Sequence, residues 1–239
     1  MDKFAKIEKS LMHPRYVWEL PVRFYHWINA LVVVILTITG FIIGDPPAIQ
    51  SASEASFSYW FGTVRFIHFV AAYVFLFNFV MRTYWGFAGN RFARWSNFIP
   101  YTKQHWIDMW EVIKVDIFQV KCHVDPNLGH NALASFTYFL TFIVFTLQVL
   151  TGFGIYAAMS PSWFPQLFAW VPALLGGDII TRDIHHILMW FFILFAIVHV
   201  YLVFYHDYIE KNGVTSSMIG GWKFQHKDKV EREKERSKK

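Results

Sequence analysis

The stretch that decides the fold is Arg182-Asp183-Ile184-His185-His186-Ile187-Leu188-Met189-Trp190-Phe191-Phe192-Ile193-Leu194-Phe195-Ala196-Ile197-Val198-His199. Its apolar centre is long enough to form most of a membrane-spanning helix, yet histidines stand at both ends. Ionisable side chains are costly inside hydrocarbon, so these histidines are candidates for a functional site. On a helix, His185 and His199 face within about 40° of each other and lie about 21 Å apart along the axis. His186 is rotated about 140° from His199 and is expected to face away from the ligand direction. One helix therefore predicts two ligand sites at two depths of a membrane.

The composition of this 239-residue chain is that of an integral membrane protein. Hydrophobic residues make up 55% of it and charged residues only 16%, against roughly 25% charged residues in soluble domains. The mean hydropathy is positive, at +0.31. The single cysteine, Cys122, excludes internal disulfides and any iron–sulfur cluster held by this chain alone. The sequence contains no Cys-x-x-Cys-His motif, so a haem would not be attached covalently in the c-type manner.

Four apolar segments predict an all-α membrane protein with a four-helix transmembrane bundle. The predicted spans are residues 27–44, 64–86, 133–158 and 185–206. The first is longer than a signal-peptide core and no cleavage site follows it, so we expect it to remain in the protein. The bundle is expected to occupy residues 1–210, followed by a basic tail at 211–239 that is solvated from Lys223 onward.

Two segments between the spans have their own patterns. Residues 103–121 carry apolar side chains at helical spacing with charges opposite, which predicts an amphipathic helix lying in the cytoplasmic interface. Residues 162–177 are apolar but too short and too interrupted by proline to span. They predict a half-buried loop on the outer face or a docking surface for a partner.

The positions of the cations predict the orientation in the membrane. All but two of the 22 lysines and arginines lie in three segments. These are the two terminal tails and the loop after the second span, counted together with Arg82 at the end of that span. If the four helices alternate in direction, these segments share one side, which the positive-inside rule makes cytoplasmic. We therefore expect a multi-pass protein of the bacterial inner membrane with both termini in the cytoplasm. Anionic lipid is the expected partner of this charge, and nucleic acid is not expected.

Arginines stand three residues before three histidines. The motifs are Arg23-x-x-His26, Arg65-x-x-His68 and Arg182-x-x-His185. Residues at i and i+3 are neighbours on one helix face, so each arginine could pair with a carboxylate of a group that the histidine ligates. Haem propionates fit this role. The alternative interpretation, that these arginines are interfacial anchors, explains the repeated spacing less well.

Alternating helix direction pairs the histidines by depth. His68 and His185 open the second and fourth spans on the outer side, whereas His26 and His199 lie toward the inner side. Two bis-histidine sites at opposite membrane faces are expected of a protein that holds two b-type haems for transmembrane electron transfer. A haemless anchor, or a small transporter that uses the histidines to carry protons, is the alternative from another functional class.

Several motifs resemble those of a known family. They are Arg23-x-x-His26-Trp27 followed by Thr39-Gly40, then Arg182-x-x-His185-His186-Ile187-x-x-Trp190-x-Phe192-x-x-Phe195-x-x-x-His199, with Gly89-Asn90-Arg91 and Gly129-His130-Asn131. The chain resembles, over nearly its whole length, the cytochrome b subunit of membrane-bound nickel–iron uptake hydrogenases, within the bacterial cytochrome b561 group. Asp183 stands where that family more often has a small residue. The family's haem-iron ligands carry over onto His26, His68, His185 and His199.

The resemblance implies an electron-transfer subunit whose partners perform the hydrogen chemistry. A periplasmic large subunit would oxidise hydrogen, and the iron–sulfur clusters of a small subunit would pass electrons to the outer haem b, the inner haem b and then a quinone, menaquinone or ubiquinone. Quinone is expected near the inner haem, where Arg23, His206 and Asp207 are candidate contacts or ordinary interfacial residues. A formate-dehydrogenase-like membrane subunit and a stand-alone cytochrome b561 oxidoreductase are the alternatives.

Overall fold

The computed structural model describes residues 12–48, 59–99, 103, 106, 107, 109, 110, 114, 132–210 and 212–226. The chain divides into two compact units. We call residues 25–84 and 140–198 the helical unit, and residues 1–24, 85–139 and 199–239 the terminal unit. The predicted boundary at residue 210 between a membrane domain and a tail remains a prediction.

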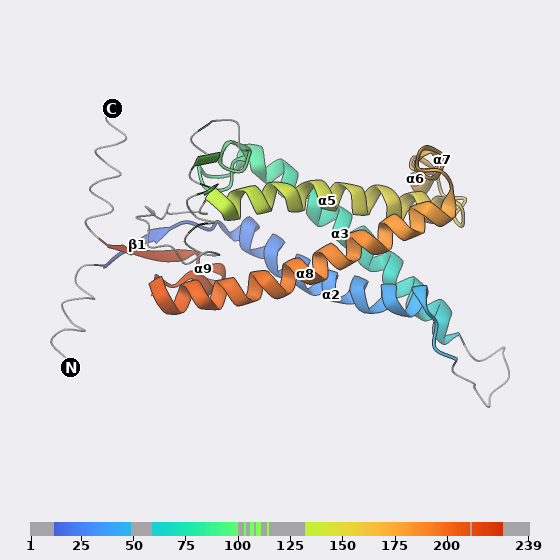
Figure 1. Ribbon diagram of the computed structural model, residues 1–239, viewed down its shortest axis with the longest axis horizontal. Coiled ribbons are helices and arrows are strands. Elements are labelled where there is room, and N and C mark those ends of the chain that lie inside the picture. The colour runs from blue at the N-terminus through green and yellow to red at the C-terminus, as the bar shows by residue number, and fades with distance from the viewer. Residues whose placement is uncertain are drawn as a thin grey trace. The chain divides into compact units, whose positions relative to one another are not determined.

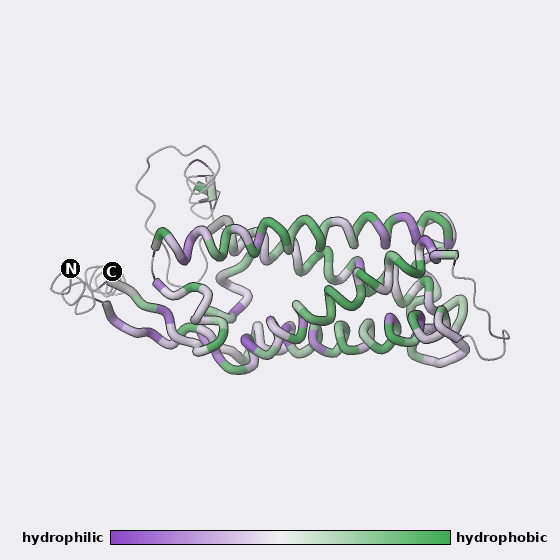
Figure 2. Tube along the Cα trace, turned by 90° about the horizontal axis from the view of Figure 1, so that it is seen from below, coloured by the Kyte–Doolittle hydropathy of each residue, from purple (hydrophilic) through white to green (hydrophobic). Residues whose placement is uncertain are grey.

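Four long helices dominate the chain (Figure 1). They are α2 (Leu20–Gly44), α3 (Trp60–Ala88), α5 (Ala132–Ala157) and α8 (Asp178–Glu210). Each is long and apolar enough to cross a membrane, and Figure 2 shows hydrophobic residues along most of their length. The prediction of four long apolar helices is confirmed. Many of their large apolar side chains are exposed, which suits a lipid environment in which helices satisfy their own backbone hydrogen bonds.

The helices begin earlier than the apolar runs that predicted them. Helix α2 starts at Leu20 and carries Pro21 in its first turn, a position that proline tolerates because the first amide groups have no partner within the helix. Helix α8 starts at Asp178, after two glycines with φ of 96° and 111° at residues 176 and 177. An aspartate in the first turn is favourable at a helix N-terminus. Polar first turns therefore extend these helices beyond their hydrophobic centres.

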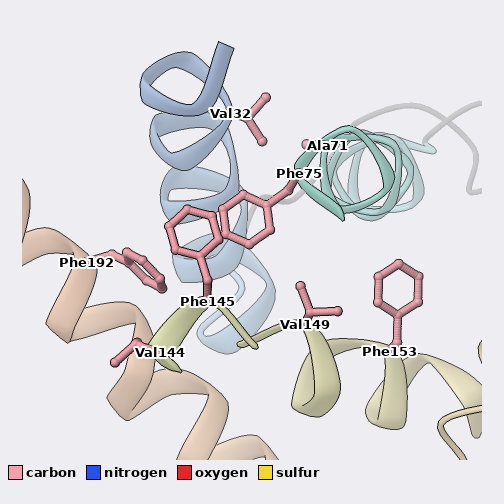
Figure 3. Packing of buried hydrophobic residues seen from close by; sticks show 8 residues of the cluster. All are labelled: Val32, Ala71, Phe75, Val144, Phe145, Val149, Phe153 and Phe192. Atoms are coloured by element: carbon pink, nitrogen blue, oxygen red, sulfur yellow. The ribbon is translucent and has the colours of Figure 1, made fainter. Parts of the chain in front are cut away.

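The core of the helical unit is a cluster of aromatic and aliphatic side chains from all four helices (Figure 3). The rings of Phe75 and Phe145 stack with centroids 4.3 Å apart and an angle of 6° between their planes. Phe192 meets Phe145 edge-on at 5.1 Å, and Val32 completes the cluster from α2. Van der Waals packing of this kind holds helices together in lipid, where no hydrophobic gain drives them to associate.

The segment between α5 and α8 forms two short helices rather than a plain loop. They are α6 (Trp163–Gln166) and α7 (Trp170–Leu175). Gly154 of α5 allows α7 to approach, because a Cβ atom there would lie 3.0 Å from Cβ of the buried Val171. Partner docking at this segment remains a prediction.

The terminal unit contains a small sheet that the sequence did not reveal. Strand β1 (Met12–Tyr16) pairs antiparallel with β2 (Trp222–His226), from Met12 opposite His226 to Tyr16 opposite Trp222. Helix α9 (Val214–Gly220) precedes β2. The amide groups of Val17 and Trp18 donate to the Gly221 carbonyl oxygen at 2.9 and 3.2 Å. Residues 223–226 therefore belong to a strand that pairs with β1, while Phe224 is still 43% exposed, so a solvated tail from Lys223 onward remains a prediction.

The Gly89-Asn90-Arg91 motif has a structural explanation within the terminal unit. The Asn90 amide donates to Glu19 Oε2 at 2.8 Å, and its side-chain Nδ2 donates to the Val17 carbonyl oxygen at 2.9 Å. Asn90 Oδ1 accepts from the amides of Phe92 and Ala93 at 3.0 and 3.1 Å. One asparagine thus joins the turn after α3 to the segment before α2, while the 3-10 helix η2 (Trp95–Asn97) follows the turn.

Some predicted features fall where the structure describes little or nothing. The amphipathic helix at 103–121 lies mostly outside the described residues, although the six described positions there have helical backbone. Cys122 and Gly129-His130-Asn131 lie outside them altogether.

Candidate functional site

A cavity of about 390 Å³ lies among the four helices of the helical unit. This volume is within the range of small-molecule sites. Both histidines of the predicted outer pair, His68 from α3 and His185 from α8, line it. Arg65 and Arg182, which precede them by one helical turn, line it as well. The structure therefore brings both outer Arg-x-x-His motifs to one cavity.

His68 is held by a threonine of α2. The Oγ1 atom of Thr39 lies 2.8 Å from His68 Nδ1. The same hydroxyl donates to the Ile35 carbonyl oxygen at 2.7 Å, and the Thr39 residue is only 7% exposed. The next residue, Gly40, lacks a side chain beside the imidazole, and a Cβ atom there would lie 3.7 Å from His68 Cε1.

His185 has the same kind of support from α5. Thr151 Oγ1 lies 2.9 Å from His185 Nδ1 and donates to the Leu147 carbonyl oxygen at 2.8 Å. Gln148 Nε2 lies 3.2 Å from His185 Nε2. A Cβ atom on Gly152 would lie 2.9 Å from His185 Cε1, which is closer than such carbon contacts normally are. The imidazole therefore occupies space that only glycine leaves open.

The prediction that His186 faces away from the site is wrong. His186 lines the same cavity, and a Cβ atom on Gly44 of α2 would lie 2.7 Å from its Cε1 atom. The rotation of about 100° per residue explains the difference. His185 turns toward α5 and His186 toward α2, and the cavity is wide enough to be lined by both.

The two arginines make the cavity cationic. Arg65 Nη2 lies 2.9 Å from Met159 Sδ, a thioether that is only a weak acceptor. Its guanidinium carbon also lies 5.9 Å from the Phe69 ring centroid. None of the described residues that line the cavity carries a carboxylate. Two guanidinium groups without an acidic partner on the wall favour an anionic group in the cavity.

These residues fit a b-type haem. His68 and His185 would supply two imidazoles to a haem iron, the apolar wall would accommodate the macrocycle, and Arg65 and Arg182 would pair with the propionates. Gln148 Oε1 is buried and has no hydrogen-bond partner among the described residues. Buried polar atoms normally have a hydrogen-bond partner, so an unpaired one is expected at the wall of a site that binds a further group.

The residues of the predicted inner site fall in both units of the chain. His26 lies on α2 in the helical unit, with its ring 5.1 Å from that of Trp27. His199 lies on α8 in the terminal unit. Their pairing remains a prediction.

The predicted quinone contacts all lie in the terminal unit. Arg23 donates from Nη1 to the Ile219 carbonyl oxygen, which gives it a structural role beside α9. The ring of His206 lies 5.6 Å from that of Tyr205, and His206 and Asp207 are half-buried near the end of α8. Quinone binding by these residues, and propionate binding by Arg23, remain predictions.

Sequence reasoning assigned no role to the threonines that contact the outer histidines, although Thr39-Gly40 belongs to one of the family motifs. A signal for them exists, because the dipeptide Thr-Gly occurs twice in the apolar helices, as Thr39-Gly40 in α2 and Thr151-Gly152 in α5. In each case the threonine contacts a histidine through Nδ1 and the glycine lies beside the ring, although only Gly152 is too close for a Cβ atom to be added. Gln148 was missed as well, and no local pattern marks it.

Comparison with known proteins assigns the family. Residues 17–221 match the family described as prokaryotic cytochrome b561. A protein of Cupriavidus necator, named probable Ni/Fe-hydrogenase B-type cytochrome subunit, is 39% identical over 226 residues, which cover 93% of this chain and 92% of that protein. A protein of the same name from Azotobacter vinelandii is 37% identical and covers 87% of this chain and 88% of its own length. The probable Ni/Fe-hydrogenase 1 B-type cytochrome subunit of Escherichia coli is 32% identical, covering 93% and 95%. This chain therefore belongs to the prokaryotic cytochrome b561 family.

Proposed function

We propose that this chain is the membrane cytochrome b subunit of a nickel–iron hydrogenase, which binds two haems b and conveys electrons from the hydrogenase small subunit to quinone. The observation that carries the proposal is the cavity in which His68, His185, Arg65 and Arg182 meet. The names of the relatives favour hydrogenase over a formate-dehydrogenase-like or stand-alone role. When bound, haem b supplies one-electron redox chemistry that no side chain provides.

The residues divide the work of holding the cofactors. His68 and His185 would ligate the outer iron, and Arg65 and Arg182 would neutralise the outer propionates. His26 and His199 would ligate the inner iron. Both the imidazoles and the guanidinium groups are supplied by long helices, whose backbone is rigid enough to fix ligand positions.

Part of the wall of the outer cavity is apolar. Phe75, Met189 and Phe192 are all buried and line it. These apolar side chains lower the local dielectric constant below that of water, which would strengthen the attraction between an anionic group and the half-buried Arg65.

The location and partners follow from the same proposal. The chain would lie in the bacterial inner membrane with both termini in the cytoplasm, where its cations contact anionic lipid. The large and small hydrogenase subunits would bind on the outer side, and quinone would bind near the inner haem, with Arg23, His206 and Asp207 as the candidate contacts.

Haem stoichiometry tests the proposal. The pyridine haemochrome assay on the purified complex is expected to give two haems b per chain for the wild type and one for His68→Ala or His185→Ala. The control is His13→Ala, because His13 is an exposed residue of β1 and belongs to the terminal unit. Two full equivalents in either cavity variant, or no b-type absorption in the wild type, would refute it. Co-purification with hydrogenase subunits rather than with a formate dehydrogenase tests the partner.

A further inference from the structure

We infer that Thr39 and Thr151 are positioning residues that fix the tautomer of the outer histidines and raise the electron donation of their Nε2 atoms. The inference rests on the proposed function, because it concerns the ligands of the outer haem. It goes further by assigning a task to two threonines that do not touch the iron.

The direction of the hydrogen bonds follows from the number of hydrogens. A threonine hydroxyl has one hydrogen, and a carbonyl oxygen can only accept. Thr39 Oγ1 lies 2.7 Å from the Ile35 carbonyl oxygen, a separation typical of an O–H···O bond. The hydroxyl hydrogen is therefore committed to the carbonyl, and the contact of 2.8 Å with His68 Nδ1 requires the hydrogen to be on Nδ1.

The same reasoning holds for the second threonine. Thr151 Oγ1 donates to the Leu147 carbonyl oxygen at 2.8 Å, so His185 Nδ1, 2.9 Å away, must donate to the hydroxyl. An independent contact agrees with this tautomer. The Gln148 amide nitrogen can only donate, and it lies 3.2 Å from His185 Nε2, which must then carry the lone pair.

Neither threonine lies on a helix that supplies an outer ligand. Helices α3 and α8 provide the histidines, whereas α2 and α5 provide the hydroxyls. The glycine after Thr151 removes a side chain that would displace the His185 ring, whereas a Cβ atom on Gly40 would only touch His68 at 3.7 Å. All four helices therefore fix the two imidazoles, by the same Thr-Gly dipeptide used twice.

The chemical consequence is a stronger iron ligand. Metal-bound histidines commonly donate their other ring N–H to an acceptor, which fixes the tautomer and raises ligand basicity. A more basic Nε2 favours the oxidised state of a bound iron. Removal of either hydroxyl is therefore expected to raise the midpoint potential of one haem.

The test is a potentiometric titration of the purified complex, with variants that separate the hydroxyl from the shape of the side chain. Thr39→Val and Thr151→Val remove the hydroxyl at nearly constant volume, whereas Thr39→Ser and Thr151→Ser keep it. The control is Thr146→Val on α5, because Thr146 Oγ1 also donates to its own helix, at 3.0 Å from the Phe142 carbonyl oxygen.

The valine variants are expected to shift one of the two midpoint potentials upward. A tenfold change in the relative affinity for ferric over ferrous iron corresponds to about 59 mV for one electron. The serine variants and the control are expected to keep the wild-type potentials. Loss of one haem in a valine variant but not in the matching serine variant would also support the role of the hydroxyl.

Two results would overturn the inference. One is unchanged potentials with both haems retained in the two valine variants. The other is identical behaviour of serine and valine variants, which would assign the effect to packing. These failures differ from failure of the proposed function, which would appear as a wild-type complex without two haems b.

Discussion

Glycine 152 is the position at which one added carbon would most directly disturb the outer cavity. In Gly152→Ala, the new Cβ atom would lie 2.9 Å from Cε1, 3.6 Å from Nδ1 and 3.8 Å from Nε2 of His185. The ring cannot move freely to relieve this contact, because Thr151 Oγ1 lies 2.9 Å from Nδ1. We expect the imidazole to be displaced from the position in which it would ligate iron.

The size of the effect follows from opposing contributions. Overpacking in a well-packed interior costs about 1–3 kcal/mol. Replacing glycine by alanine within a helix has the opposite effect, because it raises the free energy of unfolding by about 0.5–1 kcal/mol. The stabilisation of the helix is the same with and without haem, so it does not change haem affinity. The displacement of His185 does change haem affinity, because this residue would ligate the iron. We therefore expect haem affinity at the outer site to fall about 5–150-fold, the equivalent of 1–3 kcal/mol.

Two other glycines provide matched controls for this prediction. Gly62 of α3 has nothing within 4 Å of an added Cβ atom, so Gly62→Ala should leave haem binding unchanged. Gly44→Ala would place Cβ 2.7 Å from Cε1 of His186, but His186 is exposed and can rotate away at lower cost.

The measurement is the rate and extent of haem loss to an excess of an apoprotein acceptor, followed by the b-type absorption. The expected order of haem loss is Gly152→Ala fastest, then Gly44→Ala, with Gly62→Ala equal to wild type. Equal retention of both haems by the Gly152 and Gly62 variants would refute the conclusion that glycine is required beside His185.

Two further predictions concern the core and the charge of the cavity. Phe145→Ala should lower the free energy of unfolding by about 3–5 kcal/mol, because Phe145 is 3% exposed and contacts both Phe75 and Phe192. Phe145→Leu should lower it much less. Equal thermal unfolding temperatures of the two variants in detergent would contradict this prediction. Arg65→Gln removes a cation that stabilises the added electron, so it should lower one haem midpoint potential by up to about 40 mV, from the 0.2–1 kcal/mol of a partly exposed ion pair. Arg65→Lys keeps the positive charge, so its haem midpoint potential should stay close to that of the wild type. A redox titration that gives the same potential for Arg65→Gln and Arg65→Lys would contradict the electrostatic role.

The sequence by itself determined those features that depend on local geometry. An apolar run of sufficient length commits its backbone to a helix in lipid, because no water is present to satisfy the amide groups. The four long helices were therefore predictable without any knowledge of their packing. Helical periodicity also placed Arg65 with His68, and Arg182 with His185, on shared faces, because residues three apart are neighbours whatever the tertiary structure.

Only the tertiary structure decided which helix each side chain meets. The contact between Thr39 and His68 joins α2 to α3, and the rotation of each helix about its axis sets which face meets its neighbour. The same rotation brought His186 into the cavity, although its angle relative to His199 suggested otherwise. Strands β1 and β2 pair residues from nearly opposite ends of the chain, so no local pattern announces them. Sequence periodicity specifies directions around one helix axis, whereas contacts depend on the packing of several, and that packing brings the threonines, glycines and histidines of the outer cavity together.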